Sequence, residues 1–236
     1  GQNLLGSTVA LVAQRLGCAA GDVRPVVGDS AASPDSGAVA ASRATTLVWR
    51  ALQAPATADW LSQVLQSGAA LLGRPAASLR LGPGGLWQGD RLALGLRALA
   101  HALGAALPEV LIDLPADETP SPIPSAHHVF GACAALAQVA VDSWTGQLQV
   151  QRVVLASALG PVVSAEGYLG QMEGGLLIGQ GLATVEALPM AGGHYLARNL
   201  DAYLVPTLAD APVMEVIAVE NLLPGDASGP RGAGEI

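Results

Sequence analysis

The sequence is 236 residues long, with a net charge of −8, 51% hydrophobic residues and only 13% charged residues. Its basic residues are all arginine and are scattered along the chain, so no basic patch interleaved with aromatic residues exists and nucleic-acid binding is disfavoured. The hydrophobic content suits a densely packed core, and the scarcity of charge predicts an apolar face that another subunit or chain segment covers.

The first half of the chain is predicted to be mainly helical. Apolar residues recur at helical spacing in four segments, 3–17, 38–52, 56–72 and 91–103. Gly17 suits the end of the first helix, and Thr57 is the expected N-cap of the third. A strand is predicted at 23–27, and residues 78–81 and 86–88 are predicted to form a hairpin.

A proline-rich stretch divides the chain. Its prolines favour an extended backbone between the two flanking parts. We therefore expect a first αβ part at residues 1–106, a connection at 107–126 and a second αβ part at 127–236.

The second half is predicted to combine strands with one long helix. Residues 129–141 and 147–156 are expected to pair as an antiparallel hairpin through the Asp142–Gly146 turn. A helix at 164–188 and a strand at 213–220 follow. Hairpins mixed with separate helices indicate an α+β fold and not a doubly wound parallel sheet.

Residues 170–181 contain five glycines in twelve positions. Each glycine would cost an exposed helix roughly 1 kcal/mol relative to alanine, so a closely approaching group must compensate. Gln171, Glu173 and Gln180 exclude a membrane span. Tight helix packing is one interpretation; the other is a buried helix start at which the Gln171 amide contacts the edge of a heterocycle or a phosphate.

Two further segments offer groups that suit a ligand. Residues 35–45 combine small side chains with the N–H groups of a helix start, which can cradle an anion or simply form a capped helix. At the chain end, the Glu235 carboxylate follows Gly232, Ala233 and Gly234, so nothing bulky shields it. A surface turn is the alternative for that segment.

Neither the cysteines nor the adjacent histidines predict a metal site. Cys18 and Cys133 are far apart in the sequence and are expected to be buried, reduced thiols. Neighbouring residues on an extended chain point to opposite faces, so His127 and His128 are not placed to share an ion.

Four segments, taken in order, carry a resemblance to a known family: Gly1-Gln2-Asn3, 35–45, 170–175 and 231–236. Together they resemble the molybdenum-binding subunit of the xanthine dehydrogenase and aldehyde oxidase family, C-terminal half only. Asn3 stands where the family has glycine, and Ile236 stands where it has proline. The resemblance implies the fold of the second half of the molybdopterin-binding region.

The resemblance also implies an activity and a site. The family are oxidoreductases that hydroxylate an aldehyde or an N-heterocycle such as a purine, with water as the oxygen source. Glu235 matches the catalytic base. The matching cofactor contacts are Gln2, Ala41, Ser42, Arg43, Thr45 and Gln171.

The implied cofactor is molybdenum–molybdopterin, with iron–sulfur clusters and an optional FAD on other subunits. The implied partners are the other half of the molybdenum subunit, an iron–sulfur subunit and an optional flavin subunit, besides a small-molecule substrate. By itself the chain is expected to be inactive. No secretory signal is recognisable, and a cytoplasmic location is expected. The alternative is a non-catalytic fragment that cradles the cofactor, or a degenerate structural subunit.

Overall fold

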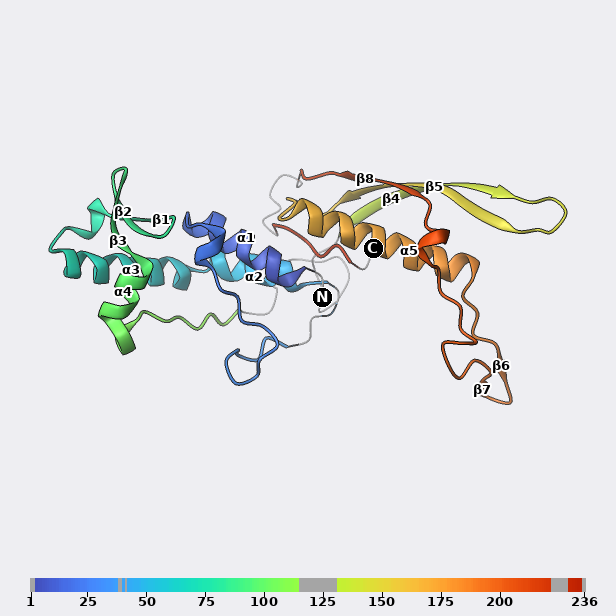
Figure 1. Cartoon of the computed structure of the whole chain (residues 1–236), viewed down its shortest axis with the longest axis horizontal. Helices are drawn as coiled ribbons and strands as arrows, with labels where there is room; N and C mark the ends of the chain where they lie inside the picture. The colour runs from blue at the N-terminus through green and yellow to red at the C-terminus, as the bar shows by residue number, and fades with distance from the viewer. Residues whose placement is uncertain (1–2, 38–39, 41, 115–130, 222–228, 235–236) are drawn as a thin grey trace, which may run out of the picture. The chain divides into compact units, whose positions relative to one another are not determined.

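The computed structural model describes residues 3–37, 40, 42–114, 131–221 and 229–234. These residues form two compact units (Figure 1). Unit 1 contains the described residues up to 114 together with 229–230. Unit 2 contains 131–221 and 231–234.

Unit 1 combines four α-helices with a small antiparallel sheet. The helices are α1 (Leu4–Leu16), α2 (Ala44–Gln53), α3 (Pro55–Leu72) and α4 (Leu96–Leu103). The sheet has the order β1-β2-β3, from β1 (Arg80–Gly82), β2 (Gly85–Gln88) and β3 (Arg91–Gly95). Short 3₁₀ turns occur at Ala20–Asp22, Ala76–Ser78 and Gly104–Ala106. The predicted helices at 3–17 and 56–72 and the predicted hairpin are confirmed.

Three predictions for unit 1 are wrong. Residues 23–27 do not form a strand. Residues 91–103 form a helix only from Leu96, because β3 pairs with β2 before the chain turns into α4. Thr57 is not a cap: Pro55 occupies the first turn of α3 after the N-cap Ala54, and the Thr57 hydroxyl donates to Ala51 O at 2.8 Å.

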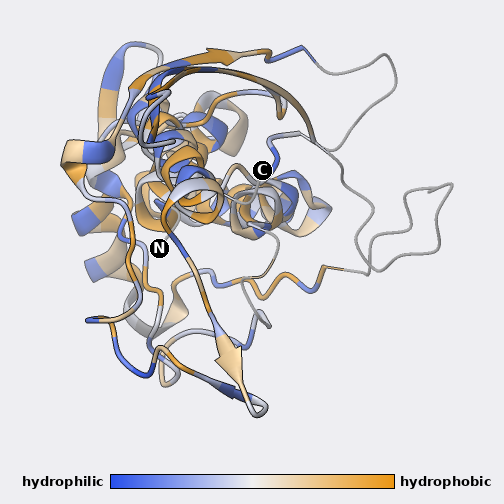
Figure 2. Cartoon of the chain, turned by 90° about the vertical axis from the view of Figure 1, so that its right-hand side faces the viewer, coloured by the Kyte–Doolittle hydropathy of each residue, from blue (hydrophilic) through white to orange (hydrophobic). Residues whose placement is uncertain are grey.

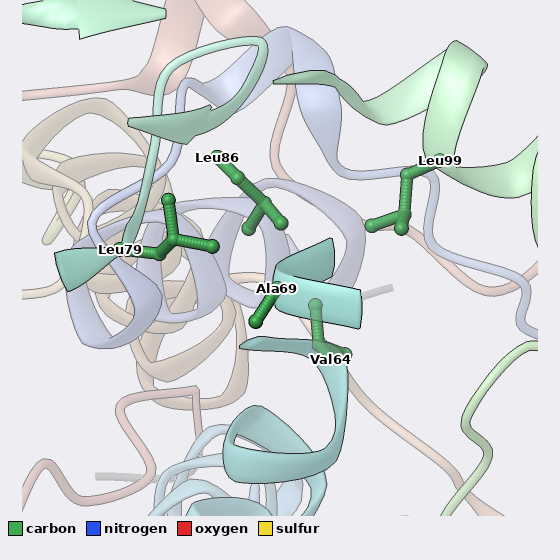
Figure 3. Packing of buried hydrophobic residues seen from close by; sticks show 5 residues of the cluster. All are labelled: Val64, Ala69, Leu79, Leu86 and Leu99. Carbon is green, nitrogen blue, oxygen red and sulfur yellow. The ribbon is translucent and has the colours of Figure 1, made fainter. Parts of the chain in front are cut away.

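The core of unit 1 lies between α3, α4 and the small sheet. It is built from five buried side chains, shown in Figure 3: Val64, Ala69, Leu79, Leu86 and Leu99. Leu86 is fully buried. Outside this core, the Asp22 carboxylate accepts hydrogen bonds from Ala19 N and Gly84 N at 2.9 and 2.8 Å, which attaches the first 3₁₀ turn to the hairpin.

Unit 2 is a mixed three-stranded sheet with one long helix along it (Figure 1). The strands β4 (Ala132–Val141) and β5 (Leu148–Ala158) pair antiparallel, as predicted, and β8 (Val213–Ala218) pairs parallel to β5. The helix α5 spans Ala165–Thr184. Minor elements are β6 (Met190–Ala191), β7 (His194–Tyr195) and a 3₁₀ turn at Leu208–Asp210. The α+β class is confirmed.

One face of β5 packs against α5. Val153, Leu155 and Ser157 are buried in alternation, as expected for a strand with one face covered. Leu155 and Leu159 pack with Met172 of α5, which is 1% exposed. This cluster forms the core of unit 2.

Side-chain hydrogen bonds stabilise two connections in unit 2, the β4–β5 turn and the chain that follows α5. In the β4–β5 turn, Asp142 Oδ1 accepts from Trp144 N and Thr145 N at 2.8 Å each, and the N–H of Thr145 contributes most to lowering the Asp142 pKa. Beyond the end of α5, the Tyr203 hydroxyl donates to Glu186. That hydrogen bond is the main reason why the pKa of Tyr203 is raised.

Several large apolar side chains are exposed, and that another chain covers them stays a prediction. Trp144 is 96% exposed at the hairpin turn, Leu208 is 91% exposed, and Leu136 on β4 is 67% exposed. Figure 2 shows apolar residues on the strands as well as on the helices. Among the described helices, none is both long enough and apolar enough to cross a membrane.

Candidate functional site

The loop that leads into α2 has an unusual backbone at Ser42. Ser42 is 4% exposed and has a φ of 52°, a left-handed conformation that residues other than glycine adopt rarely. Holding such a residue costs on the order of 1–3 kcal/mol, and strain of this kind concentrates at ligand-binding sites. Earlier in the loop, Gly37 N donates to Asp35 Oδ1 at 2.9 Å and Gly37 also has a positive φ of 71°.

Arg43 is the N-cap residue of α2. Its N–H donates to Ala40 O at 3.3 Å, and its carbonyl accepts from Leu47 N at 3.0 Å. The Arg43 side chain makes no capping hydrogen bond to the first turn, and its guanidinium lies close to Gly37. Thr45 lies in the first turn, half-buried. The N–H groups and the dipole of a helix start favour a negatively charged group.

The first two turns of α2 also contact the end of unit 1. Thr46 is 6% exposed, and its hydroxyl donates to Pro230 O at 2.8 Å. Gly229 lies over the Trp49 ring so closely that a Cβ there would lie 2.6 Å from ring atoms. These contacts were not predicted from the sequence. Thr46 and Pro230 are 184 residues apart, and no local sequence pattern indicates that they meet.

Gln171 lies inside α5 and not at a helix start, so that part of the prediction is wrong. The helix begins seven positions earlier at its N-cap Ser164, whose hydroxyl accepts from Gly167 N at 3.3 Å. Burial was also overestimated, because only Met172 and Gly181 of α5 are buried and the other residues of the helix are half-buried or exposed. Gln171 itself is half-buried.

Three glycines of α5 have open space beside them. Outside the adjoining turns of α5 itself, no described atom lies within 4 Å of the position that a Cβ would take at Gly170, Gly174 or Gly179. Packing within this unit therefore does not explain these three glycines. Gly181 differs: a Cβ there would collide with Pro206 and the Glu186 carboxylate, so it serves local packing.

The segment that precedes Glu235 is attached to unit 2. Arg231 N donates to Leu159 O at 2.9 Å, and Ala233 packs against the Leu155–Leu159–Met172 cluster. A Cβ at Gly175 of α5 would lie 3.8 Å from Gly234 O, which is ordinary contact distance. The glycines and the alanine of this segment therefore follow the surface of α5 and β5 closely.

The structure describes four of the predicted site residues. Ser42, Arg43 and Thr45 lie together at the start of α2 in unit 1, and Gln171 lies in unit 2. Gln2, Ala41 and Glu235 lie outside the described residues. That all seven residues share one site stays a prediction.

Asn3 shows how one departure from the family motif is accommodated. It is the N-cap residue of α1, with φ 51° and ψ 30°. Asparagine tolerates this left-handed conformation better than most side chains, so it keeps a backbone that glycine would adopt readily.

The cysteines differ from expectation in burial. Cys133 is exposed and Cys18 is half-buried, and neither forms a disulfide. Burial is the main reason why the Cys18 pKa is raised, with the nearby Asp22 charge second. Within the described ranges, no three His, Cys, Asp or Glu side chains gather as a metal site would require.

Comparison with known proteins agrees with these features. Residues 1–212 match the family described as the molybdopterin cofactor-binding domain. The chain is 40% identical over 238 residues to a probable xanthine dehydrogenase subunit from Bacillus subtilis, in an alignment that covers 100% of this chain and 31% of that protein. The chain thus spans less than a third of this relative's length.

Solved structures show the same fold. Quinoline 2-oxidoreductase from Pseudomonas putida 86 matches with a TM-score of 0.70 at 23% identity, over 99% of this chain and 30% of that one. CO dehydrogenase from Oligotropha carboxidovorans matches with a TM-score of 0.72 at 18% identity, over 99% and 29%. The family expected from the motifs is confirmed: the chain belongs to the molybdopterin cofactor-binding domains of the xanthine dehydrogenase and aldehyde oxidase type.

Proposed function

We propose that this chain is the C-terminal part of the molybdenum subunit of a hydroxylase that oxidises an aldehyde or an N-heterocycle such as a purine. The observation that carries the proposal is the alignment of the entire chain, at 40% identity, with a probable xanthine dehydrogenase subunit. An alignment of that extent includes the segments around Gln2, Ser42, Gln171 and Glu235.

The described residues fit a molybdopterin cofactor in their chemistry. The start of α2 offers backbone N–H groups beside the strained Ser42, which suits the phosphate of a pterin. On α5, the Gln171 amide carries both a donor and an acceptor, and the three glycines with open space beside them leave room for a close approach. Arg43 adds positive charge next to the α2 start. Gln2 and Ala41 are proposed to complete these contacts.

The cofactor and the protein have different proposed roles in the reaction. When bound, the cofactor supplies the two-electron redox chemistry that places a water-derived oxygen on carbon. Glu235 is proposed to accept the proton of the attacking oxygen nucleophile, as a general base. The contacts of Arg231, Ala233 and Gly234 with unit 2 support this role, because they hold the chain up to the residue before Glu235.

The proposed partners are the remainder of the molybdenum subunit, an iron–sulfur subunit that removes electrons, and an optional flavin subunit. Two observations support association. The chain spans 31% of its relative, and large apolar side chains such as Leu136, Trp144 and Leu208 are exposed. Exposed apolar side chains mark a protein–protein interface where they gather into a contiguous patch.

A second candidate function is cofactor cradling without catalysis. This candidate is favoured because the chain aligns with only 31% of its relative. The residues that line a substrate pocket need not lie in that 31%. The two candidates differ in one measurable property, which is turnover by the cofactor-loaded protein.

The test is to purify the complete protein with its neighbouring subunits from cells supplied with molybdate. We expect stoichiometric molybdenum and pterin, and oxidation of at least one aldehyde or purine with a dye as electron acceptor. Full cofactor loading without turnover of either substrate class would favour the second candidate function, cofactor binding without catalysis. A folded, assembled protein that lacks molybdenum would contradict both functions.

A further inference from the structure

The Thr46 hydroxyl makes a hydrogen bond that a helix does not need. A threonine inside a helix commonly donates to the carbonyl four residues earlier. Thr46 instead donates to Pro230 O at 2.8 Å, and the bond is buried because Thr46 is 6% exposed and Pro230 is also buried. Pro230 lies in neither a helix nor a strand, so this hydroxyl fixes the direction of its carbonyl.

A second, independent contact acts on the neighbouring residue. Gly229 is buried and has a φ of 67°, and its Cα lies against the Trp49 ring. Any side chain at 229 would be both strained and in collision with that ring. Trp49 lies three residues after Thr46, so the two side chains share one face of α2.

These contacts join two segments to which the proposed function gives separate roles. Thr46 follows Ser42 and Arg43 within one turn of α2, and Pro230 is followed directly by the segment that ends in Glu235. We propose that Thr46 is a positioning residue which, together with Trp49, holds Gly229–Pro230 on α2 and so fixes the point from which the chain continues toward Glu235. This inference rests on the proposed function, because the position matters only if Glu235 is the base.

Loss of this hydrogen bond should loosen the segment without unfolding it. Arg231, Ala233 and Gly234 keep their own contacts with β5 and α5. The expected effect is therefore a displaced base, to which turnover is sensitive: misplacement by about 1 Å can cost ~10²-fold in rate. Cofactor binding should be little affected, since Ser42, Arg43 and Gln171 are unchanged.

The chain offers a matched control in Thr57. Thr57 is also 6% exposed, and its hydroxyl also donates to a backbone carbonyl, Ala51 O, at 2.8 Å. Thr46→Val and Thr57→Val thus remove the same kind of buried hydrogen bond. Only the first bond reaches Pro230, the residue that directly precedes the Glu235 segment.

The experiment uses the complete, assembled enzyme with Thr46→Val, Thr46→Ser and Thr57→Val. We expect Thr46→Val to lower kcat by roughly 10- to 100-fold with unchanged KM and molybdenum content. Thr46→Ser should restore kcat to near the parent value, and Thr57→Val should leave it unchanged. A second readout is hydrogen exchange by mass spectrometry, which should show faster exchange of the peptide covering 229–234 in Thr46→Val only.

Several results would overturn the inference. They are a parent-level kcat and unchanged exchange in Thr46→Val, an equal kcat loss in Thr57→Val, or a loss of molybdenum that accounts for the lost activity. If Thr46→Val does not fold, Gly229→Ala displaces the same segment from the Trp49 side and must show the same kcat loss. Glu235→Gln, assayed in parallel, separates the two claims. Full activity of that variant refutes the proposal that Glu235 is the base, while hydrogen exchange in Thr46→Val still tests whether Thr46 holds Gly229–Pro230 on α2.

Discussion

Gly68 of α3 and Leu86 of β2 lie in such close contact that a Cβ at position 68 would be 2.0 Å from Leu86 Cδ1. Leu86 is fully buried, with Val64, Ala69, Leu79 and Leu99 around it (Figure 3). The missing side chain at 68 is therefore what lets α3 approach the small sheet.

Gly68→Ala should destabilise the protein although alanine is the better helix former. Helix propensity favours alanine by about 1 kcal/mol. Overpacking of a core typically costs about 1–3 kcal/mol. Because the new Cβ would lie 2.0 Å from Leu86 Cδ1, we expect a cost at the upper end of that range. Thermal unfolding should show a net loss, and Leu86→Ala should relieve it in a double-mutant cycle. An additive pair would contradict the contact.

Ser157→Ala should be costly for its size. The Ser157 hydroxyl is 1% exposed and lies 2.6 Å from the Tyr168 hydroxyl, between β5 and α5. Removing it leaves the tyrosine hydroxyl without this partner, at a cost of about 1–3 kcal/mol. The control is Ser67→Ala, which removes an exposed bond to Gln63 O and should change unfolding little. Equal losses in the two variants would contradict a special role for Ser157.

Asp210 should make the 3₁₀ turn at Leu208–Asp210 sensitive to acid. The N–H and then the hydroxyl of Thr207 donate to its carboxylate and lower its pKa from 3.8. A lowered pKa contributes stability above the unfolded value, and that stability is lost as the pH falls through the folded value. Asp210→Ala should therefore lower the melting temperature at neutral pH. The difference from the parent should shrink below about pH 4, and a difference that does not depend on pH would contradict this account.

Gln171→Ala should reduce cofactor content before it affects anything else. Alanine keeps the helix, so α5 should stay intact while the amide contact is lost. Glu173→Ala, on the exposed surface of the same helix, is the matched control and should keep full molybdenum. The measurement is molybdenum per assembled enzyme, with activity scaled to it. Equal molybdenum in both variants would show that Gln171 is not a cofactor contact.

The elements that sequence predicted well are those with a strong local signal. Helix α1 has apolar residues at helical spacing and ends at Gly17, which has a φ of 71°. The β4–β5 hairpin turns at Asp142, whose side chain organises the turn. The α2 loop was placed correctly because small residues precede a periodic run.

The features that were misplaced or missed could not be recognised from the local periodicity of the sequence. β3 has a helical pattern of leucines but pairs with β2, and the parallel pairing of β5 with β8 has no local signature. Gln171 was placed at a helix start because glycines usually interrupt helices, yet α5 continues through them. Thr46 was missed because its partner lies 184 residues away.

The central claim is that Glu235 is the base of a molybdenum hydroxylase. Its most direct test is the kcat of Glu235→Gln in the assembled, cofactor-loaded enzyme, with Glu173→Gln as the matched surface control. The glutamine keeps shape and volume but has no carboxylate to accept a proton. We predict a kcat at least ~10²-fold below the parent with unchanged molybdenum content. Turnover of an aldehyde or a purine at the parent rate, with full molybdenum, would contradict the claim.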